Sequence, residues 1–495
     1  MKTTTCFTTV NSNSYLYDSE NQYMIAIHPV IKLIAGMDRR NVPFTKEQKL
    51  HILKKFPELA ESDLSFYLKK YFFLKENRFF QEISIQELLS ARLTSQTVEA
   101  QLSNVDHLLF QVTADCNLEC RYCCYGDLYE NPEPHRTGSL SFQQAKKVLD
   151  YLVPYWNSNH NISYENKIII GFYGGEPLVN FNLIKKIVEY VQTIRLNNQA
   201  TFTFNMTTNA LLLDRYMDFL VQHDFSILLS LDGNEIHDYL RVDKNGKPTF
   251  KRVFTNIKRF RELYPDFFEK NIQFNALLNN QSTPEAIYSF IKEEFDKIPM
   301  ISSLSIHGLR IDKKEEFKKI YKPYQESQDL GKKLGSRSSR YKNAGYFFYY
   351  HLQNAYRQYY EIMMRTKKTE KKIPTGTCLP FWKKMFISSV GEIYACERIG
   401  FDHILGHVKE KVELNFEEIA NFYNRCFDFL REQCTECYQA DFCSECMFQF
   451  PFKNGNPVCN KQQSLPEHEE YLANIMESLE NNPESFDDIN KMTFA

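Results

Sequence analysis

The cysteines constrain this chain most, because their positions are grouped. Of 13 cysteines, Cys6 stands alone, four lie between Cys116 and Cys124, and eight lie between Cys378 and Cys459. Thiols that only fill a core would be scattered along the sequence. Two dense groups predict that ligands are being gathered, and in a reducing cytoplasm metal or redox chemistry explains them better than disulfides do.

Composition limits the partners. The 495 residues carry 60 Lys and Arg against 62 Asp and Glu, so the net charge of -2 predicts neither a nucleic-acid partner nor a membrane surface. The first residues are polar and form no signal peptide, and no apolar run reaches the roughly 18 residues of a membrane span. We therefore expect a cytoplasmic chain with more than one packed core.

Strands and helices alternate between residues 105 and 310. The candidate strands are His107–Ala114, Lys167–Tyr173, Thr201–Thr207, Phe225–Leu231, Asn271–Leu278 and Ile301–Leu309. The candidate helices are Phe142–Trp156, Leu178–Leu196, Leu211–His223, Lys251–Leu263 and Glu285–Lys297. Ser141 and Gln144 predict a capping box at the first helix. This order predicts an α/β core whose parallel sheet is covered on both faces and open as a partial barrel, with chemistry at the strands' carboxyl ends.

Four other regions flank this core. Residues 1–100 contain two apolar runs, Ser14–Tyr17 and Tyr23–Ile27, which predict a hairpin, and helical patterns at Thr45–Phe56 and Ser62–Phe73. Residues 311–375 indicate a largely helical connector with a loop at 337–340. Residues 376–465 hold the second cysteine group, and residues 466–495 predict an acidic helical tail.

The first cysteine group follows the first strand. Cys116, Cys120 and Cys123 have the spacing C-x3-C-x2-C. Three thiolates of one loop can hold three corners of a cubane iron–sulfur cluster, which leaves the fourth iron open to a small chelating molecule. The alternatives are a structural zinc site, with Cys124 as a cramped fourth ligand, and three unrelated thiols.

Three further segments accompany this loop. Within the loop, the aromatic Tyr122 precedes the third cysteine. The three further segments are Gly174–Pro177 (GGEP), Ser230–Gly233 (SLDG) and Ile236–Asp243. With these motifs, residues 105–310 resemble the radical S-adenosylmethionine (SAM) superfamily. The resemblance implies a partial (β/α)6 barrel in which SAM chelates the open iron, accepts one electron and yields a 5′-deoxyadenosyl radical that takes a hydrogen atom from the substrate.

The resemblance also implies which residues contact SAM. Carried over by motif, they are Tyr122, Gly174, Gly175, Glu176, Pro177, Asn209, Ser230, Asp232 and Arg241. The Gly-Gly turn would approach the amino group, Ser230 the ribose and Arg241 the carboxylate. The simpler explanations are a strand-end cap for Ser230, a surface ion pair for Arg241 and an Asx-turn for Asn209.

The second cysteine group is similar to the SPASM extension of radical SAM enzymes that modify peptides. Its members are Cys378, Cys396, Cys434, Cys437, Cys443, Cys446 and Cys459, with Gly391 in a C-x12-G-x4-C segment. The resemblance implies two auxiliary [4Fe–4S] clusters, hence three in all: one on Cys378, Cys396 and Cys446, the other on the remaining four. Cys443 and Cys446 enclose two residues where the SPASM pattern usually has three, so the assignment of Cys446 as a cluster ligand rests on a weaker match than that of the other cysteines. The alternative for the whole region is a zinc site. Cys426 is either an eighth ligand or, more simply, a buried thiol that binds no metal.

Glu397 follows Cys396 directly and is a candidate general base. A carboxylate there would take a proton as a substrate radical is oxidised. Sulfatase-maturing members of the family have Asp at the corresponding place. The alternative is a structural contact between Glu397 and Arg398.

The run of motifs most resembles the peptide maturases of ribosomal peptide pathways. That implies a winged-helix-like N-terminal module that binds the leader of a precursor peptide through a strand edge, or else a mere packing subdomain, and an external flavodoxin- or ferredoxin-like electron donor. The main hypothesis is a radical enzyme that cross-links such a peptide through a thioether or C–C bond. The alternatives are an anaerobic sulfatase-maturating enzyme, which makes formylglycine, and a non-catalytic Fe–S or zinc adaptor.

Overall fold

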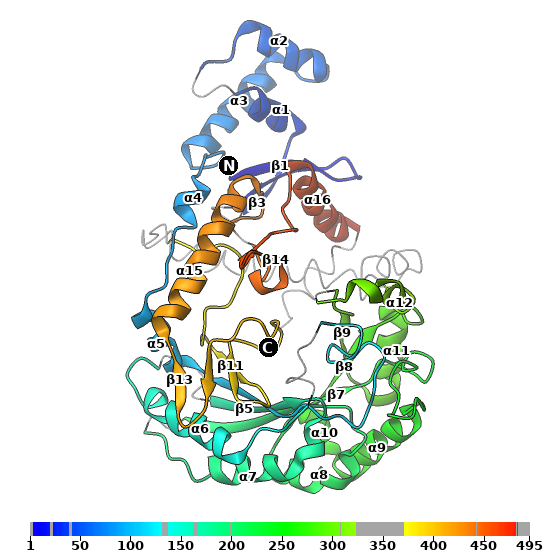
Figure 1. The fold of residues 1–495 in the computed structure, drawn as a ribbon. Helices are drawn as coiled ribbons and strands as arrows, with labels where there is room; N and C mark the ends of the chain where they lie inside the picture. The colour runs from blue at the N-terminus through cyan, green and yellow to red at the C-terminus, as the bar shows by residue number, and fades with distance from the viewer. Residues whose placement is uncertain are drawn as a thin grey trace. The chain divides into compact units, whose positions relative to one another are not determined.

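The computed structural model describes residues 3–19, 23–38, 42–130, 137–161, 167–197, 200–306, 308–322, 371–441, 443–481 and 483. The chain forms two compact units, each built from separate stretches of sequence (Figure 1). Unit 1 comprises Met1–Arg92, Arg337–Thr377 and Arg425–Ala495, and unit 2 comprises Leu93–Ser336 and Cys378–Asn424. No helix in the described ranges combines the length and apolarity that crossing a bilayer requires.

A ten-stranded sheet forms the centre of unit 2, in the order β13-β12-β11-β10-β4-β5-β6-β7-β8-β9. Its six consecutive parallel strands are β4 (His107–Thr113), β5 (Lys167–Gly174), β6 (Thr201–Thr208), β7 (Ser226–Ser230), β8 (Ile272–Leu278) and β9 (Met300–Ser303). All six predicted strands are confirmed. β9 ends earlier than predicted because the chain leaves the sheet, and Leu309 pairs instead with Tyr129. Parallel strands in chain order with intervening helices are the topology of the predicted barrel.

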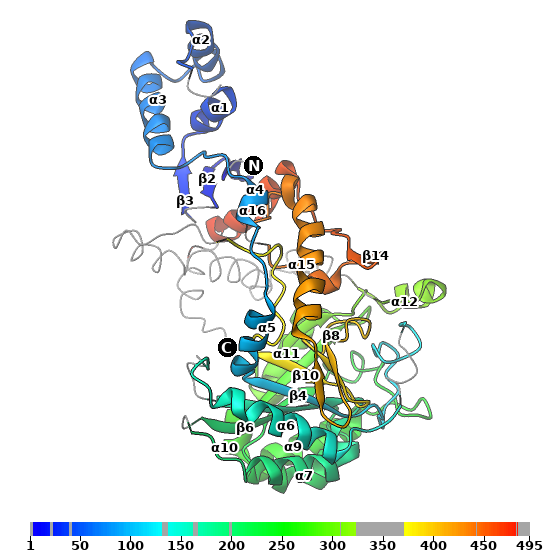
Figure 2. The same ribbon diagram turned by 60° about the vertical axis from the view of Figure 1, so that its left-hand side comes forward.

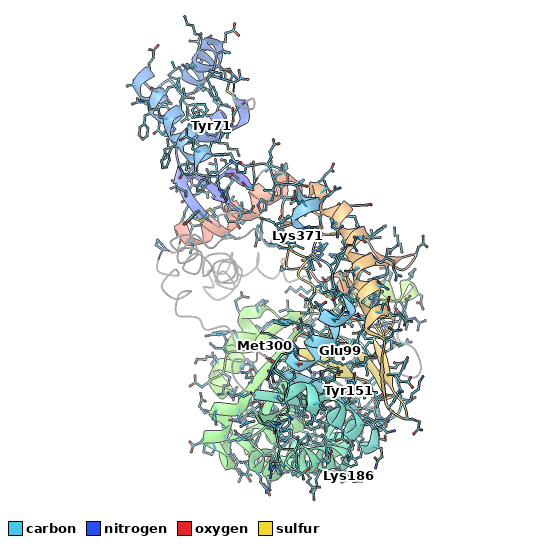
Figure 3. All side chains as sticks on the ribbon, turned by 90° about the vertical axis from the view of Figure 1, so that its left-hand side faces the viewer. Tyr71, Glu99, Tyr151, Lys186, Met300 and Lys371 are labelled. Atoms are coloured by element: carbon cyan, nitrogen blue, oxygen red, sulfur yellow. The ribbon has the colours of Figure 1, made fainter. Side chains whose placement is uncertain are left out.

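Helices connect these strands and lie along the outside of the sheet (Figure 1). They are α6 (Phe142–Trp156), α7 (Phe181–Val191, after the 3-10 turn Pro177–Asn180), α8 (Leu213–Gln222), α9 (Phe250–Leu263), α10 (Pro265–Asn271) and α11 (Pro284–Phe295). The start of α6 is confirmed, because Ser141 and Gln144 cap each other's backbone N–H as predicted. Figure 3 labels Tyr151 of α6, Lys186 of α7 and Met300 of β9.

The two faces of the sheet differ on the strands β6 to β8. On β6, Phe204 and Met206 are buried, whereas Thr203, Asn205 and Thr207 remain partly exposed. The same alternation runs through β7 and β8. The expectation that both faces would be covered is therefore wrong for these strands: among the described residues the helices pack on one face, and the other is a half-open inner face of mostly polar, partly exposed residues.

Strand β10 extends the sheet beyond the barrel. β10 (Lys384–Ile387) lies parallel to β4, with Lys384 opposite His107. The antiparallel strands β11 (Glu392–Tyr394), β12 (Gly406–Val408) and β13 (Val412–Leu414) follow. Gly391 closes the β10–β11 turn at φ +83°, where its N–H donates to the carbonyl of Ser388. A positive φ explains why this position of the cysteine motif is glycine.

Unit 1 begins with a three-stranded antiparallel sheet in the order β1-β2-β3. The strands are β1 (Thr4–Thr8), β2 (Ser14–Asp18) and β3 (Tyr23–Ile27), and the helices α1 (Pro29–Met37), α2 (Lys46–Lys55) and α3 (Glu61–Glu76) follow. The β2–β3 hairpin and the last two helices confirm the prediction, whereas β1 and α1 were not expected. Tyr71 of α3, labelled in Figure 3, lies in their shared core and donates to Asp38 Oδ2 over 2.8 Å. Figure 2 shows the three helices gathered at one end of the sheet.

The cysteine-rich part of unit 1 contains few regular elements. α15 (Phe416–Gln433) runs across the sequence boundary of the two units, and a 3-10 turn (Cys434–Glu436) follows it. The two-stranded β14 (Phe452–Lys453) and β15 (Asn456–Pro457) precede α16 (Leu465–Asn481), which confirms the helix predicted in the tail as far as Asn481, while residues 484–495 lie outside the described ranges. Of the predicted connector, α12 (Lys314–Lys318) is described, while residues 323–370, including the loop at 337–340, lie outside the described ranges.

Candidate active site

The cysteine loop leaves the carboxyl end of β4, where a parallel sheet places its chemistry. Cys116, Cys120 and Cys123 are neighbours, because the charge of Cys123 raises the pKa of Cys116, and the charges of Cys123 and Cys116 raise that of Cys120. Burial, the larger effect, raises the pKa of Cys116 to about 11 and that of Cys120 to about 12. A bound metal would remove these protons. Three thiols on one loop supply the number of ligands that three corners of a cubane need, and their role as ligands stays a prediction.

Backbone pairing holds this loop against the segment after β7. Glu119 N donates to Val242 O over 2.8 Å, and Arg121 N donates to Leu240 O over 3.0 Å. The loop also closes on itself, because Cys123 N donates to Cys120 O over 3.0 Å. The Ile236–Asp243 motif is therefore the backbone partner of the cysteine loop.

The Gly-Gly pair is required by the same loop. A Cβ on Gly174, which has φ +149°, would stand 2.1 Å from Thr113 O, and one on Gly175 would stand 2.4 Å from Ala114 O. The backbones are joined there, since Gly175 N donates to Thr113 O over 3.0 Å. Any side chain at either position would push the loop before Cys116 away.

Glu176 turns inward from the Gly-Gly pair and joins two strand ends. Its carboxylate accepts hydrogen bonds from Thr208 Oγ1 at 2.7 Å, Asn209 N at 2.7 Å and Leu178 N at 3.1 Å. Burial raises the pKa of Glu176, and the three donors oppose that shift. Pro177 begins the following 3-10 turn. The Asx-turn considered for Asn209 is present, because its Oδ1 accepts Leu211 N at 3.0 Å.

Tyr122 is the centre of a buried polar cluster beneath the loop. Its hydroxyl donates to Asp232 Oδ2 and accepts a hydrogen bond of 2.9 Å from Arg241 Nη1. Arg241 Nε also stands 3.7 Å from Asp238 Oδ1, and both side chains are almost fully buried. A surface ion pair is thus the wrong explanation for Arg241. Its contact with the SAM carboxylate stays a prediction.

Ser230 ends β7 on the half-open inner face, directly opposite Asn275 of β8. Asp232, two residues on, accepts Leu277 N at 2.9 Å and so ties these two strand ends together. The ribose contact proposed for Ser230 remains a prediction. Asn275, a polar neighbour on the same face, was not singled out from the sequence.

Glu397 lies after β11, and Lys384 is its main partner. Lys384 Nζ is 3.1 Å from both carboxylate oxygens, and Cys396 Sγ is 3.2 Å from Oε2. Burial acts to raise the pKa of Glu397, but the Lys384 cation and hydrogen bonds outweigh it and hold the pKa below its usual value. Arg398, the predicted contact, reaches Oε1 only at 3.8 Å and is largely exposed. Sequence reasoning missed Lys384.

Two tyrosines relate Glu397 to the cysteine loop within unit 2. Burial raises the pKa of Tyr173 most, and the charges of Cys124 and Glu397 raise it further. Burial likewise raises the pKa of Tyr125 most, and the charges of Tyr173, Cys124 and Glu397 raise it further. Tyr173 directly precedes the Gly-Gly pair, which is the one sequence signal that could have identified it. The arrangement sets a carboxylate and two phenols beside the loop.

Four cysteines of unit 1 form a second group of neighbouring thiols. Burial raises the pKa of Cys434 to about 12, and the charges of Cys437, Cys443 and Cys459 raise it further. These are the four cysteines predicted for one auxiliary cluster. For the other, Cys446 lies in unit 1 while Cys378 and Cys396 lie in unit 2, so that set stays a prediction. Cys426 is fully buried within α15, as a spare core thiol would be. Across the described ranges, no three His, Cys, Asp or Glu side chains are grouped as ligands of a single metal ion.

Comparisons with known proteins agree with this geometry. Residues 110–293 match the model of the radical SAM superfamily. An uncharacterised protein of Methanocaldococcus jannaschii is 28% identical over 65% of this chain and 94% of its own. A cysteine-type anaerobic sulfatase-maturating enzyme of Clostridium perfringens is 24% identical over 67% and 85% of the two chains. The radical SAM cyclopropyl synthase TigE of Paramaledivibacter caminithermalis is 20% identical over 70% and 68%.

The fold is shared with a solved structure. Native anSMEcpe with bound AdoMet superimposes with a TM-score of 0.50 at 17% identity, covering 78% of this chain and all of the other. The match extends well beyond residues 110–293, so it includes more than the parallel barrel.

Proposed function

We propose that the chain is a radical SAM enzyme of the SPASM type that modifies a ribosomally made precursor peptide, joining two of its atoms by a thioether or C–C cross-link. The observation that carries the proposal is the cysteine loop at the end of β4, clamped by the Gly-Gly pair and paired with the Ile236–Asp243 segment. Relatives that include a sulfatase-maturating enzyme, whose substrate is a polypeptide, support a peptide substrate.

Cys116, Cys120 and Cys123 would hold the [4Fe–4S] cluster through three thiolates and leave its fourth corner to SAM. When bound, that pair supplies a 5′-deoxyadenosyl radical able to remove a hydrogen atom from a substrate. The protein itself would orient SAM and the substrate and exclude water from the site. The polar inner face beside Ser230 and Asn275 is the surface proposed to line the reacting groups.

Glu397 is proposed to accept the substrate's proton after hydrogen abstraction. Its depressed pKa keeps it ionised near neutral pH, and Lys384 holds both oxygens in a fixed direction. Two auxiliary clusters would be held by two sets of cysteines and would supply an acceptor for the substrate's electron; the sets are Cys434, Cys437, Cys443 and Cys459, and Cys378, Cys396 and Cys446. An external flavodoxin- or ferredoxin-like protein would reduce the loop cluster.

The N-terminal sheet is proposed to bind the leader of the peptide. Within the described ranges β3 pairs with β2 on one side, and no strand pairs with its other side. An extended peptide can add to such an edge through main-chain hydrogen bonds. The β1-β2-β3 sheet followed by three helices suits the predicted winged-helix-like module.

The test is a mass measurement on peptides encoded beside the gene. The reconstituted chain, SAM and reductant are incubated without oxygen with each peptide, with and without its leader. We expect a mass loss of two hydrogens per cross-link, formation of 5′-deoxyadenosine, and a slower reaction without the leader that recovers when the leader is added separately.

Two controls accompany this test. A chain with Cys116, Cys120 and Cys123 replaced by alanine should form no 5′-deoxyadenosine. A sulfatase-derived peptide serves as the alternative substrate. Conversion of that peptide to formylglycine, with every neighbouring peptide unchanged in mass, would replace the proposal by sulfatase maturation.

A further inference from the structure

Asn209 connects the end of β6 to the first cysteine of the loop. Its Nδ2 donates to Asn117 Oδ1 over 2.8 Å and lies 3.8 Å from Cys116 Sγ, within reach of an N–H···S hydrogen bond. The same sulfur accepts Leu118 N at 3.4 Å. Asn209 is 6% exposed, so neither donor competes with bulk water.

Glu176 fixes the direction of Asn209. One carboxylate oxygen accepts the Asn209 backbone N–H, while the other accepts Thr208 Oγ1 and Leu178 N. The Asn209 side chain is then held at both ends, because its Oδ1 accepts Leu211 N while Nδ2 points at the loop. A carboxylate that is 1% exposed and fully occupied by donors acts as a clamp.

Hydrogen bonds to the ligand sulfurs of an iron–sulfur cluster raise its reduction potential, because they stabilise the more negative, reduced state. We infer that Asn209 donates to the Cys116 sulfur to ease one-electron reduction of the loop cluster, and that Glu176 is the residue positioning that donor. The inference rests on the proposed function in one respect, that this loop holds the cluster. The electron comes from the same external donor or, in the test, from dithionite.

Potentiometric titration followed by electron paramagnetic resonance tests this inference on the full, cluster-loaded chain. The signal that changes when SAM is added identifies the loop cluster. Asn209→Ser keeps a side-chain oxygen for the turn but removes the N–H donor. We expect the equilibrium constant for reduction to fall about tenfold, which corresponds to about 59 mV for one electron.

Asn279 offers a matched control. It follows β8 as Asn209 follows β6, is fully buried, and forms the same turn, with Oδ1 accepting Gln281 N at 2.9 Å. Its Nδ2 donates to His237 O rather than to the cysteine loop. Asn279→Ser should therefore leave the potential of the loop cluster unchanged.

Glu176→Gln provides a second, independent variant. It removes one acceptor from Asn209 and also a negative charge that acts on Cys116, and these two changes shift the potential in opposite directions, so this variant is measured for cluster content. An unchanged potential in Asn209→Ser, or an equal fall in Asn279→Ser, would overturn the inference. Loss of the cluster from both Asn209→Ser and Glu176→Gln, with Asn279→Ser loaded, would replace tuning by a purely structural role. A wild-type chain without a SAM-responsive cluster would instead refute the proposed function.

Discussion

At the scale of single residues, Glu397 carries the sharpest expectation for chemistry. Glu397→Gln keeps the size of the side chain and removes the base, so product formation should fall about 10²-fold or more while SAM cleavage continues. Because the pKa of Glu397 is lowered, the wild-type rate should show no loss from this group between pH 8 and pH 6. Quantifying the modified peptide and 5′-deoxyadenosine separately checks both statements.

Arg398→Ala is the control for that variant. Arg398 is largely exposed, and its contact with Glu397 is long, at 3.8 Å. Removing the Arg398 side chain should therefore leave the product rate within about twofold of wild type. If Glu397→Gln forms product as fast as wild type, and both Glu397→Gln and Arg398→Ala have lower thermal stability, a structural contact between Glu397 and Arg398 is favoured over a catalytic base.

Asp238 makes stability depend on pH. Burial, only partly opposed by Arg241, raises the pKa of Asp238 to about 8, while an unfolded Asp titrates near 3.9. Between those values the folded chain binds more protons, so its free energy of unfolding should fall as pH rises from about 4 to about 8. Asp238→Asn should flatten this decline in melting temperature.

The exposed Asp296 serves as the comparison. Hydrogen bonding to Lys292 lowers the pKa of Asp296, so Asp296→Asn can alter stability only through the loss of a favourable charge at higher pH. Its melting profile from pH 5 to pH 8 should run parallel to that of wild type. A profile of Asp238→Asn that also runs parallel would contradict the prediction.

At this scale, the sequence predicted those functional residues that lie close together along the chain. The cysteine loop and the Gly-Gly pair were identified because each lies within a few consecutive residues. Lys384 and Tyr173 were not, because their roles depend on which strands neighbour β4. The parallel pairing of β10 with β4 joins residues far apart in sequence, and no local pattern indicates it.

At the scale of elements, the turn after β5 is the tightest constraint. Gly174→Ala adds a methyl group that overlaps Thr113 O at a φ of +149°, so the loop must move. We expect a loss of about 1–3 kcal/mol in stability and loss of the iron bound at that loop. Iron analysis and thermal unfolding measure the two effects.

Gly246→Ala distinguishes the effect of backbone strain from that of a steric overlap with the added methyl group. Gly246 also has a positive φ, +74°, but a Cβ there would meet nothing within 4 Å. It should cost some stability and leave the iron content intact. Equal iron loss in both variants would show that backbone strain, rather than the overlap, disturbs the loop.

A helix was predicted well where its apolar face and its capping residues indicated the same bounds. α6 matched in both bounds because its capping box and apolar face coincide. β1 was missed because its buried residues include threonines rather than an apolar alternation. Thr4 Oγ1, like that of Thr3, donates to the buried Asp18, so tertiary contacts replace the pattern that sequence analysis requires.

At the scale of the whole molecule, the iron count tests the second cysteine group. Cys434→Ala removes a buried thiol beside Cys437, Cys443 and Cys459. If these four hold one [4Fe–4S] cluster, the content should fall by about four irons from a total of about twelve per chain. Anaerobic iron and sulfide analysis measures it.

Cys426→Ala is the matched variant, since Cys426 is an equally buried thiol of the same unit. It should keep all of its iron and lose only a little stability. Zinc in place of iron and sulfide in the wild type would refute the cluster assignment altogether. The sequence suggested these ligand sets only through resemblance, because it cannot reveal which thiols are neighbours.

The last helix completes the first sheet. Leu472 and Ile475 of α16 pack on Phe7 and Tyr17, and Glu480 accepts hydrogen bonds from the β1–β2 hairpin. During synthesis, the apolar face of the first strands therefore stays uncovered until the ribosome has made the residues of α16. A chain that stops before residue 465 would lack this cover, so the proposed binding of a leader peptide would depend on α16 as well as on the strands.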